Sequence, residues 1–272
     1  MKNKIDIIIP YWGEFSLLKQ AVDSVLEQTS DAWHLTILDD HYPDETAKNY
    51  YSKINDKRIT YIRHCKNIGI TNNFNYAIKY ASAPFCVIMG CDDKLLPNYV
   101  ETALKNINEA DFYQPGVQVI DAKSNVYLPL VDKIKRLLRP KKSCVLAGEK
   151  LATSLCYGNW LYFPSIAWRT STLKKYSFDP RYKILQDVII ELTMIIDGAS
   201  LCFDSTETFQ YRRFADSLSS KEKSKSGIRF NEEKEVYNDF ANKFKSINWN
   251  KASFAAKTRI TSRAHSLLSK LW

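Results

Sequence analysis

The stretch Phe85-Cys-Val-Ile-Met-Gly-Cys-Asp-Asp-Lys-Leu-Leu-Pro97 decides the fold of this chain. A short apolar run ends abruptly in two adjacent carboxylates, and a proline that can open a helix follows. The run is too short to cross a membrane and is typical of a buried strand in a parallel sheet. Asp92 and Asp93 should therefore lie just past the carboxyl end of a strand, where open α/β sheets bind their ligands.

Two interpretations of this acid pair remain open on the stretch alone. A hard divalent cation that carries phosphates keeps several waters and needs only one or two protein oxygens, which Asp92 and Asp93 could supply. Alternatively, one of the two acids caps the helix that follows, because Asp is common at strand-to-helix turns.

Composition sets the outer limits. The chain has 272 residues, 45% of them hydrophobic, and a formal net charge of +9. This predicts one domain with a smaller appendage, and it favours an anionic partner such as nucleic acid, nucleotide phosphates or an acidic membrane surface. Six cysteines without a C-x-x-C pair predict reduced thiols in a cytosolic protein.

No part of the chain predicts a membrane span. The first ten residues superficially resemble a signal peptide, but Asp6 and Pro10 interrupt the run, and we interpret it as the first strand. No stretch approaches the roughly 20 apolar residues that cross a bilayer, so any membrane contact should be peripheral.

Strands and helices are expected to alternate through the first 110 residues. Apolar runs predict strands over residues 5–10, 35–38, 59–62 and 85–89, and helical spacing predicts helices over 15–29 and 45–54. Gly69 should allow a tight turn, and Thr71 or Asn72 should cap a third helix that ends near Ala81. This alternation predicts a mainly parallel sheet with helices on both faces.

Polar side chains follow three of these strands. They are Trp12 and Glu14, Asp39 and Asp40, and Asp92 and Asp93. Their convergence on one sheet edge favours the metal and nucleotide interpretation over the helix-cap one. The chain has no G-x-G-x-x-G after the first strand and no G-x-x-x-x-G-K-[ST], so a dinucleotide oxidoreductase or a P-loop NTPase is poorly supported.

Five motifs, in order and spacing, resemble the family 2 glycosyltransferases of the GT-A fold. They are Ile7-Ile-Ile-Pro10, Ser24-Val-Leu-Glu-Gln-Thr29, Leu38-Asp-Asp40, Asn67-Ile-Gly69 with Asn73 and Asn75, and Gly90-Cys-Asp-Asp93. The resemblance implies a Rossmann-like, mainly parallel sheet flanked by helices. It also implies that a nucleoside diphosphate sugar lies over the strand ends.

The resemblance further implies roles for individual residues. The nucleotide-sugar site would comprise Pro10, Trp12, Glu14, Asp40, Asn67, Gly69, Asn73, Cys91 and Asp92. A divalent metal, Mn²⁺ or Mg²⁺, would be held by Asp92 with help from Asp93. The usual family signature is Asp-x-Asp, but Gly90 replaces the first acid, and the chain is similar to a branch that carries Gly-x-Asp-Asp.

The second half, residues 111–220, should build the acceptor site, and residues 1–110 the nucleotide-sugar half. By resemblance, Asn159 and Trp160 would face the acceptor, although burial in the core explains the tryptophan equally well. Residues 121–142 carry a basic run, which is either a solvated face or a flexible loop near an anionic lipid-linked acceptor.

Three further residues have expected roles in the chemistry. Asp187 occupies the place of the family's general base, with Gln186 in place of the usual Glu; its alternative role is to favour a helix N-terminus. Arg212 and Arg213 would hold diphosphate charge, because guanidinium pairs well with phosphate oxygens. Phe214 stands where the family commonly has a histidine, and the alternative is that both arginines are surface residues.

Residues 221–272 are expected to form a basic helical extension. Between Ala241 and Trp272 there are no acids, and Ile260, Ala264, Leu267, Leu268 and Leu271 recur at helical spacing. Such a helix could lie on an anionic membrane or pack back on residues 1–220, the GT-A domain.

The resemblance implies an inverting glycosyltransferase that moves a sugar from a UDP- or dTDP-sugar to a glycan or lipid-linked acceptor. It would be cytoplasmic, either free or peripheral at the inner face of the cell membrane, and would serve bacterial surface polysaccharide synthesis. One alternative is a non-catalytic sugar-nucleotide binder. Another is a nucleic-acid-binding protein, but no recognisable nucleic-acid motif is present, and we expect no nucleic-acid partner.

Overall fold

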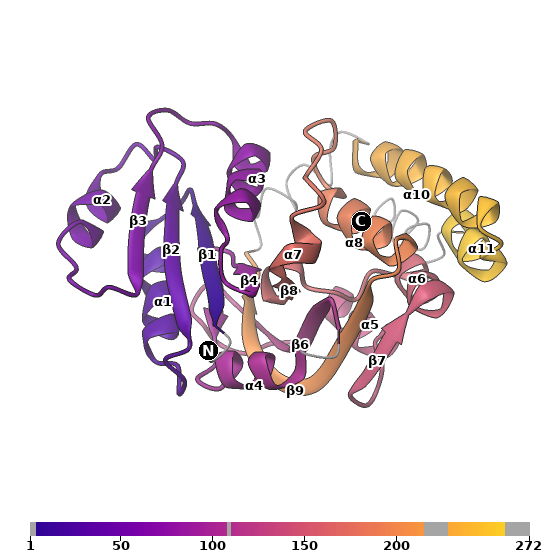
Figure 1. The fold of residues 1–272 in the computed structure, drawn as a ribbon, viewed down its shortest axis with the longest axis horizontal. Coiled ribbons are helices and arrows are strands. Elements are labelled where there is room, and N and C mark those ends of the chain that lie inside the picture. Colours follow the sequence, from indigo (N-terminus) through magenta and orange to yellow (C-terminus); the bar gives the residue numbers. More distant parts are fainter. Residues whose placement is uncertain (1–3, 108–109, 215–227, 259–272) are drawn as a thin grey trace.

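The computed structural model describes residues 4–107, 110–214 and 228–258, and these residues build a nine-stranded sheet flanked by helices (Figure 1). The strand order is β3-β2-β1-β4-β8-β6-β9-β5, and β7 pairs with β9 off this path. The chain is therefore an α/β protein of the kind expected.

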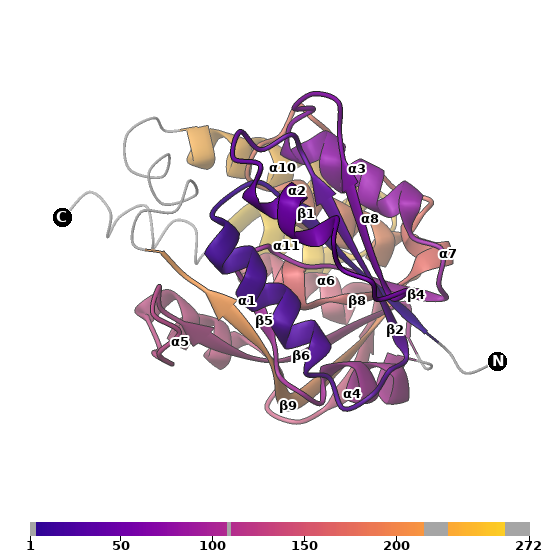
Figure 2. The same ribbon diagram turned by 90° about the vertical axis from the view of Figure 1, so that its left-hand side faces the viewer.

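The first half follows the predicted alternation. Parallel strands β1 (Ile5–Tyr11), β2 (Trp33–Asp39), β3 (Ile59–Arg63) and β4 (Phe85–Ile88) are connected through helices α1 (Phe15–Leu26), α2 (Thr46–Tyr51) and α3 (Ile70–Tyr80). Side chains alternate across the pleat, so Ile7 and Ile9 face the core under α1 while Ile8 faces the core under α3. Figure 2 shows α1 and α3 on opposite sides of these strands.

The second half adds the strands that turn the sheet from parallel to mixed. Its elements are β5 (Lys94–Leu95), α4 (Tyr99–Asn106), β6 (Phe112–Ile120), α5 (Leu130–Leu138), β7 (Cys144–Ala147), α6 (Gly148–Tyr157), η2 (Phe163–Ser165), β8 (Ala167–Arg169), α7 (Thr170–Leu173), α8 (Gln186–Ile196) and β9 (Ser200–Arg212). Strand β8 runs antiparallel to both β4 and β6, whereas β9 runs parallel to β6.

One local expectation was wrong, and one alternative is excluded. Gly69, not Thr71 or Asn72, is the N-cap of α3, and its φ of +82° lies in the region that favours glycine. The helix after Pro97 begins at Tyr99, with β5 between it and the acid pair, so Asp92 and Asp93 do not cap it.

The strand expected at residues 199–203 is also much longer than predicted. β9 continues through the polar segment 204–207 to Arg212. A pattern of buried apolar residues could not reveal this, because the pairing is maintained by backbone hydrogen bonds across register shifts around Gly116 of β6.

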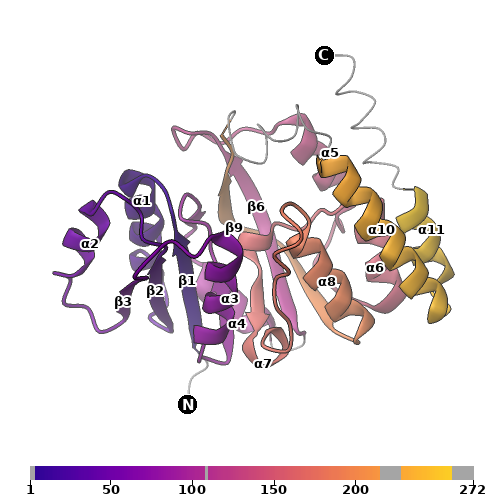
Figure 3. The ribbon, with the colours of Figure 1, turned by 90° about the horizontal axis from the view of Figure 1, so that it is seen from above.

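Two C-terminal helices, α10 (Ile228–Ser246) and α11 (Asn250–Thr258), pack on the body of the protein. Figure 3 shows them at the end of the molecule opposite to α2. Phe240 and Phe244 of α10 are buried in the core that α6 and α8 share. The linker at residues 221–225 and the apolar positions from Ile260 to Trp272 lie outside the described residues, so the boundary at residue 220 stays a prediction.

Within the part of the chain that the structure describes, none of the helices combines the length and hydrophobicity needed to cross a bilayer.

Gly116→Ala tests the pairing of β6 with β9 at the register shift around Gly116. An added Cβ would lie 2.6 Å from the carbonyl oxygen of Ser205 and 2.9 Å from that of Thr206, both rigid backbone atoms. We expect a loss of about 2 kcal/mol or more in unfolding free energy, measured by urea denaturation. Gly198→Ala is the comparison, since only its φ of +96° is strained and the space is open, so it should lose about 1 kcal/mol. Equal effects of the two variants would contradict the proposed close approach.

Candidate active site

A cavity of about 320 Å³ lies at the carboxyl ends of β1 and β4. We call it the donor pocket. Its walls contain every residue predicted for nucleotide-sugar binding except Glu14: Pro10, Trp12, Asp40, Asn67, Gly69, Asn73, Cys91 and Asp92. Glu14 is exposed and directly precedes α1 without lining the cavity. The fold thus brings together side chains from four separate segments of the sequence.

Trp12 gives the donor pocket an aromatic surface. Its side chain is 49% exposed, and its ring packs edge-on against Tyr42 with centroids 5.3 Å apart. An indole ring that is held in place yet still reaches solvent can stack on a planar base.

Asp40 and Asn73 fix the wall of the donor pocket. Asp40 is buried, and its carboxylate accepts hydrogen bonds from the backbone N–H groups of Ile68 (2.7 Å) and Gly69 (2.9 Å). Asn73 donates from its side-chain amide to the carbonyl of Leu38 at 3.0 Å, which ties α3 to β2. Both residues therefore shape the pocket through the backbone as well as lining it.

The acid pair turns back toward Gly90. Asp93 is buried, and its Oδ1 accepts a 2.8 Å hydrogen bond from the backbone N–H of Arg212, but its Oδ2 has no partner among the described residues. A Cβ at position 90 would lie 2.5 Å from that Oδ2 and 3.0 Å from Oδ1 of Asp92. The absence of a side chain at Gly90 thus gives the two acids their space.

The electrostatics of the acid pair favour a positive ligand. Burial raises the pKa of Asp92, and burial together with the neighbouring Asp92 raises the pKa of Asp93 well above its usual range. Burial also raises the pKa of the Cys91 thiol to about 12, so this cysteine is not a thiolate at neutral pH. A cation beside the two carboxylates would relieve their mutual repulsion.

The residues fit a divalent ion that arrives with a diphosphate. An unpartnered buried carboxylate oxygen next to a second carboxylate offers hard oxygen ligands. No group of three or more His, Cys, Asp or Glu side chains among the described residues could hold a metal alone. Phosphate oxygens and water would therefore complete the coordination, as is usual for Mg²⁺.

A second cavity, of about 160 Å³, shares Gly90, Asp92 and Pro164 with the donor pocket and extends it toward Arg213 and Phe214. Arg213 forms a two-point ion pair with Asp132, at 2.6 and 2.9 Å, and keeps 23% of its side chain exposed. It is placed to meet an anionic group in this extension.

Arg212 lines the same extension, but most of its side chain is enclosed by the protein, and its expected contact with diphosphate stays a prediction. Its residue is only 3% exposed. Its guanidinium donates to the carbonyls of Asp92 (2.7 Å) and Asp121 (2.9 Å) and to Oε1 of Gln20 (3.0 Å). Nη1 also donates to the carbonyl of Ala122 (3.2 Å) and to Oγ of Ser124 (3.0 Å). These bonds involve Nε, Nη1 and one hydrogen of Nη2, so they fix the guanidinium in place beside the acid pair.

Asp187 lies in the first turn of α8, and this end of α8 is tied to α3. Its neighbour Gln186 donates a 2.9 Å hydrogen bond to Thr71 of α3, and Ile70 beside Thr71 lines that pocket. Oδ1 of Asp187 accepts the backbone N–H of Val188 at 2.8 Å. Burial raises the pKa of Asp187, an effect that this hydrogen bond and Lys135 oppose.

Two residues near Asp187 were not predicted. Glu191, one helical turn on, is buried; burial and the nearby Asp187 raise its pKa well above the usual range. Lys135 of α5 faces these acids, and burial lowers its pKa to about 8. The i, i+4 spacing of the two acids on α8 was the available signal for Glu191. Lys135 was hidden in the basic run of residues 121–142.

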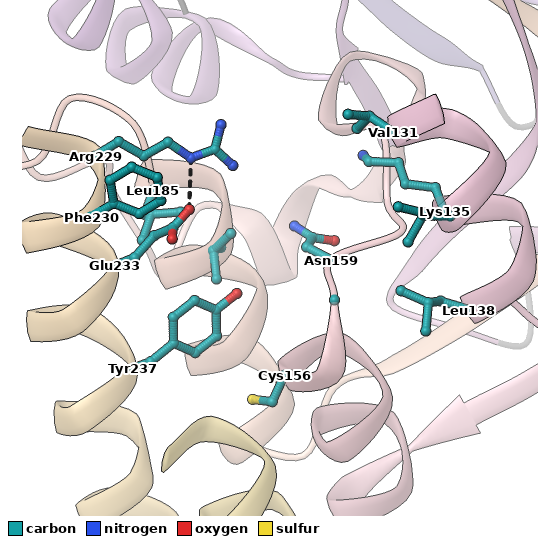
Figure 4. Close-up of a pocket in the computed structure, with 13 residues that line it drawn as sticks. Val131, Lys135, Leu138, Cys156, Asn159, Leu185, Arg229, Phe230, Glu233 and Tyr237 are labelled. Atoms are coloured by element: carbon teal, nitrogen blue, oxygen red, sulfur yellow. Dashed lines mark hydrogen bonds and ion pairs between the residues drawn. The ribbon is translucent and has the colours of Figure 1, made fainter. Parts of the chain in front are cut away.

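A third cavity, of about 170 Å³, lies between α5 and α10; we call it the acceptor-side pocket (Figure 4). Lys135 and Asn159 line it together with Arg229 and Tyr237 of α10. Asn159 donates a 2.9 Å hydrogen bond to Oε2 of Glu191.

Trp160 does not line this cavity. It is a core residue, which was the alternative to contact with the acceptor. Its residue is 1% exposed, and its indole packs edge-on against Phe203 with centroids 5.5 Å apart. Its Nε1 donates to Ser154 at 3.0 Å. Contact with an acceptor would require it to leave the core.

A family model described as glycosyl transferase family 2 matches residues 6–170, and this chain belongs to that family. It is therefore a glycosyltransferase. The match includes the whole of the donor pocket and the acid pair.

Several curated relatives carry glycosyltransferase names. The putative colanic acid biosynthesis glycosyl transferase WcaA of Escherichia coli is 28% identical over 208 residues, which are 72% of this chain and 68% of that protein. An uncharacterized glycosyltransferase of Methanocaldococcus jannaschii is 30% identical over 76% of this chain and 69% of its own length. Two Rickettsia glycosyltransferases are much longer, and the match spans only 16% and 18% of them.

The fold matches that of S. aureus TarS. The crystal structure of its residues 1–349 aligns with a TM-score of 0.71 at 16% sequence identity, over 94% of this chain and 71% of that one. The complex of the same fragment with UDP-GlcNAc aligns with a TM-score of 0.69 at 16% identity, over 89% of this chain and 66% of that one. At this identity the likeness establishes the GT-A fold.

Gly90→Ala tests the arrangement of the acid pair. The added methyl group must displace Oδ2 of Asp93, so we expect the increase in melting temperature caused by UDP with Mn²⁺ to shrink, reflecting an affinity about tenfold lower. Gly13→Ala is the matched control, because its Cβ would meet nothing closer than Sγ of Cys91 at 3.7 Å. Two variants with unchanged shifts would contradict the role of Gly90.

Proposed function

We propose that this enzyme transfers a sugar from a nucleoside-diphosphate donor to a glycan or lipid-linked acceptor, with inversion at the anomeric carbon. The observation that carries the proposal is the joining of the donor pocket, through the acid pair, to a cavity that ends at Arg213, while Gln186 next to Asp187 ties α8 to α3 beside the donor pocket.

UDP is the nucleotide that we favour, with dTDP as the second choice. TarS was crystallised with UDP-GlcNAc and with UDP. The name of a further relative, WfgD of Escherichia coli, specifies a UDP-Glc donor; it is 27% identical over 45% of this chain and 49% of its own length. Trp12 would stack on the base, and the loop held by Asp40 would surround the ribose.

A divalent cation, Mn²⁺ or Mg²⁺, would be held by Asp92 and Asp93. When bound, it would neutralise part of the charge that develops on the diphosphate leaving group. Arg213 would add a fixed positive charge on the same side, oriented by its ion pair with Asp132. Gly90-Cys91-Asp92-Asp93 would then be a variant of the family signature that keeps the metal function.

Asp187 would act as the general base. Its carboxylate would accept the proton of the acceptor hydroxyl while that oxygen forms a bond to the anomeric carbon and the bond from this carbon to the diphosphate oxygen breaks. A raised pKa makes Asp187 a better proton acceptor than an ordinary aspartate. Lys135, while protonated, stabilises the ionised form that must begin the step.

The acceptor would approach through the acceptor-side pocket. Asn159 lines this pocket, and Leu185 and Val188 on either side of Asp187 do so as well. The name of WfgD specifies a diphosphoundecaprenol-linked acceptor, and that of WcaA specifies colanic acid biosynthesis. These names support a lipid-linked acceptor in bacterial surface polysaccharide synthesis. The six free cysteines agree with action on the cytoplasmic side.

Asp187→Asn separates catalysis from donor binding. The amide keeps the shape of the side chain but cannot accept the proton, so we expect sugar transfer to fall by a factor of about 10² to 10⁴ while UDP affinity stays within twofold. Sugar transfer would be measured as the release of UDP from a panel of UDP-sugars, and UDP affinity would be measured by calorimetry.

Glu191→Gln is the control for a buried acid on the same helix face, and it should lose much less activity than Asp187→Asn. A chain that binds UDP but transfers no sugar even as the wild type would support the non-catalytic binder. Tight, salt-sensitive binding of random oligonucleotides without UDP binding would support the nucleic-acid alternative.

The pH profile tests the coupling between Lys135 and Asp187. The base works when ionised, so kcat should rise with pH through the pKa of Asp187, which lies above the ordinary value of about 3.9. Lys135→Met removes a cation that lowers this pKa, so the acidic limb should move to higher pH, by up to about one pH unit. The exposed Lys150→Met variant should leave the limb in place. A limb unmoved in Lys135→Met would contradict the coupling.

A further inference from the structure

Helix α5 differs from an ordinary surface helix because it exposes apolar side chains and buries charged ones. Its inward side carries charge, because Asp132 is buried against Arg213, and Lys135 reaches the carbonyl of Leu161 at 2.5 Å. Its outward side is apolar: Leu130, Val131, Ile134 and Leu137 are 65%, 43%, 38% and 81% exposed. A helix on a globular protein normally turns its apolar stripe toward the core.

The chain just before α5 also exposes apolar side chains. Val126 and Tyr127, just before α5, are 60% and 39% exposed. We call the six residues the apolar ridge: Val126, Tyr127, Leu130, Val131, Ile134 and Leu137. Exposed apolar side chains gathered in one segment of this kind mark a surface that meets a partner.

Basic residues are interspersed with the apolar ridge and flank it in the sequence. Lys123, Lys133, Lys141 and Lys142 are exposed, while Arg136 of α5 is paired with Glu207 at 3.0 Å. The one acid within residues 130–138 is Asp132, which is turned inward. The partner should therefore be apolar in part and negatively charged.

Charge decides between the possible occupants. A second copy of α5 would bring the same lysines face to face. Residues 259–272 of this chain carry Arg259, Arg263 and Lys270 and no acid, so they would be repelled as well. An anionic bilayer offers both negative headgroups and an apolar interior to a basic amphipathic helix.

We propose that the apolar ridge and its flanking lysines dock this enzyme on an anionic lipid membrane. Val131 and Ile134 belong to the ridge and also line the acceptor-side pocket, so the membrane surface would lie beside that opening (Figure 4). A lipid-linked acceptor could then enter without leaving the bilayer. Delivery of the acceptor rests on the proposed function, whereas docking itself does not.

Vesicle sedimentation tests the docking. The full chain would be mixed with large unilamellar vesicles of phosphatidylcholine with about 30% phosphatidylglycerol, and with phosphatidylcholine alone. We expect binding to the anionic vesicles that weakens with added salt. The double variant Leu130→Gln/Leu137→Gln should bind the anionic vesicles at least roughly tenfold more weakly, because it removes the two most exposed ridge side chains. Gln keeps the helix propensity close to that of Leu.

Phe254→Gln is the matched control, since Phe254 is a 61% exposed apolar residue on α11, outside the ridge, and its loss should not change binding. Equal melting temperatures would establish that all variants are folded.

No vesicle binding by the wild type would overturn the proposal. So would binding that survives Leu130→Gln/Leu137→Gln but is lost in Leu267→Gln/Leu268→Gln, or a wild-type dimer in solution that the ridge variant converts to monomer. UDP binding, measured without vesicles, tests the proposed function separately.

Discussion

The side-by-side placement of Asp92 and Asp93 at the end of β4 is the constraint on which the site depends. Asp93 is buried and Asp92 partly buried, the two carboxylates repel each other, and burial raises the pKa of both. Arg212 makes the arrangement possible: its backbone N–H binds Oδ1 of Asp93, and its guanidinium binds the carbonyl of Asp92. Arg212 reaches that point because β9 extends as far as this residue.

The change of strand direction next to β4 creates the space for a ligand. Because β8 runs antiparallel to β4, the segment that precedes β8 lies beside the carboxyl end of β4. That segment is η2, and Pro164 within it lines both the donor pocket and its extension. The parallel half thus supplies most of the wall of the donor pocket, and η2 of the mixed half completes that wall. The mixed half also contributes α5 and α8, which both line the acceptor-side pocket.

Much of the donor half could be predicted from sequence because its signals are local. Apolar runs that end in Asp40 or Asp92 identify strand ends, and parallel strands bring such ends to one edge. The roles of Arg212 and Arg213 could not be separated in this way. The two residues are adjacent in sequence, and only the three-dimensional contacts show that Arg212 is enclosed by backbone carbonyls while Arg213 keeps an exposed edge.

The acceptor half resisted prediction for a related reason. A basic run such as that at residues 121–142 reads as a solvated face, yet Lys135 is turned inward toward Asp187 and Glu191. Trp160 was open to two readings, and only packing against Phe203 distinguishes them. In both cases the outcome depends on which face of an element meets its neighbour, and a single sequence specifies that only through tertiary packing.

The most direct test of the central claim is a calorimetric titration of UDP into the wild type and into Asp92→Asn, with and without Mn²⁺. We expect the wild type to bind one UDP per chain, much more tightly with Mn²⁺ than without, and Asp92→Asn to lose this metal-dependent gain, roughly tenfold or more in affinity. Equal UDP binding by both proteins, unaffected by Mn²⁺, would contradict the role assigned to the acid pair.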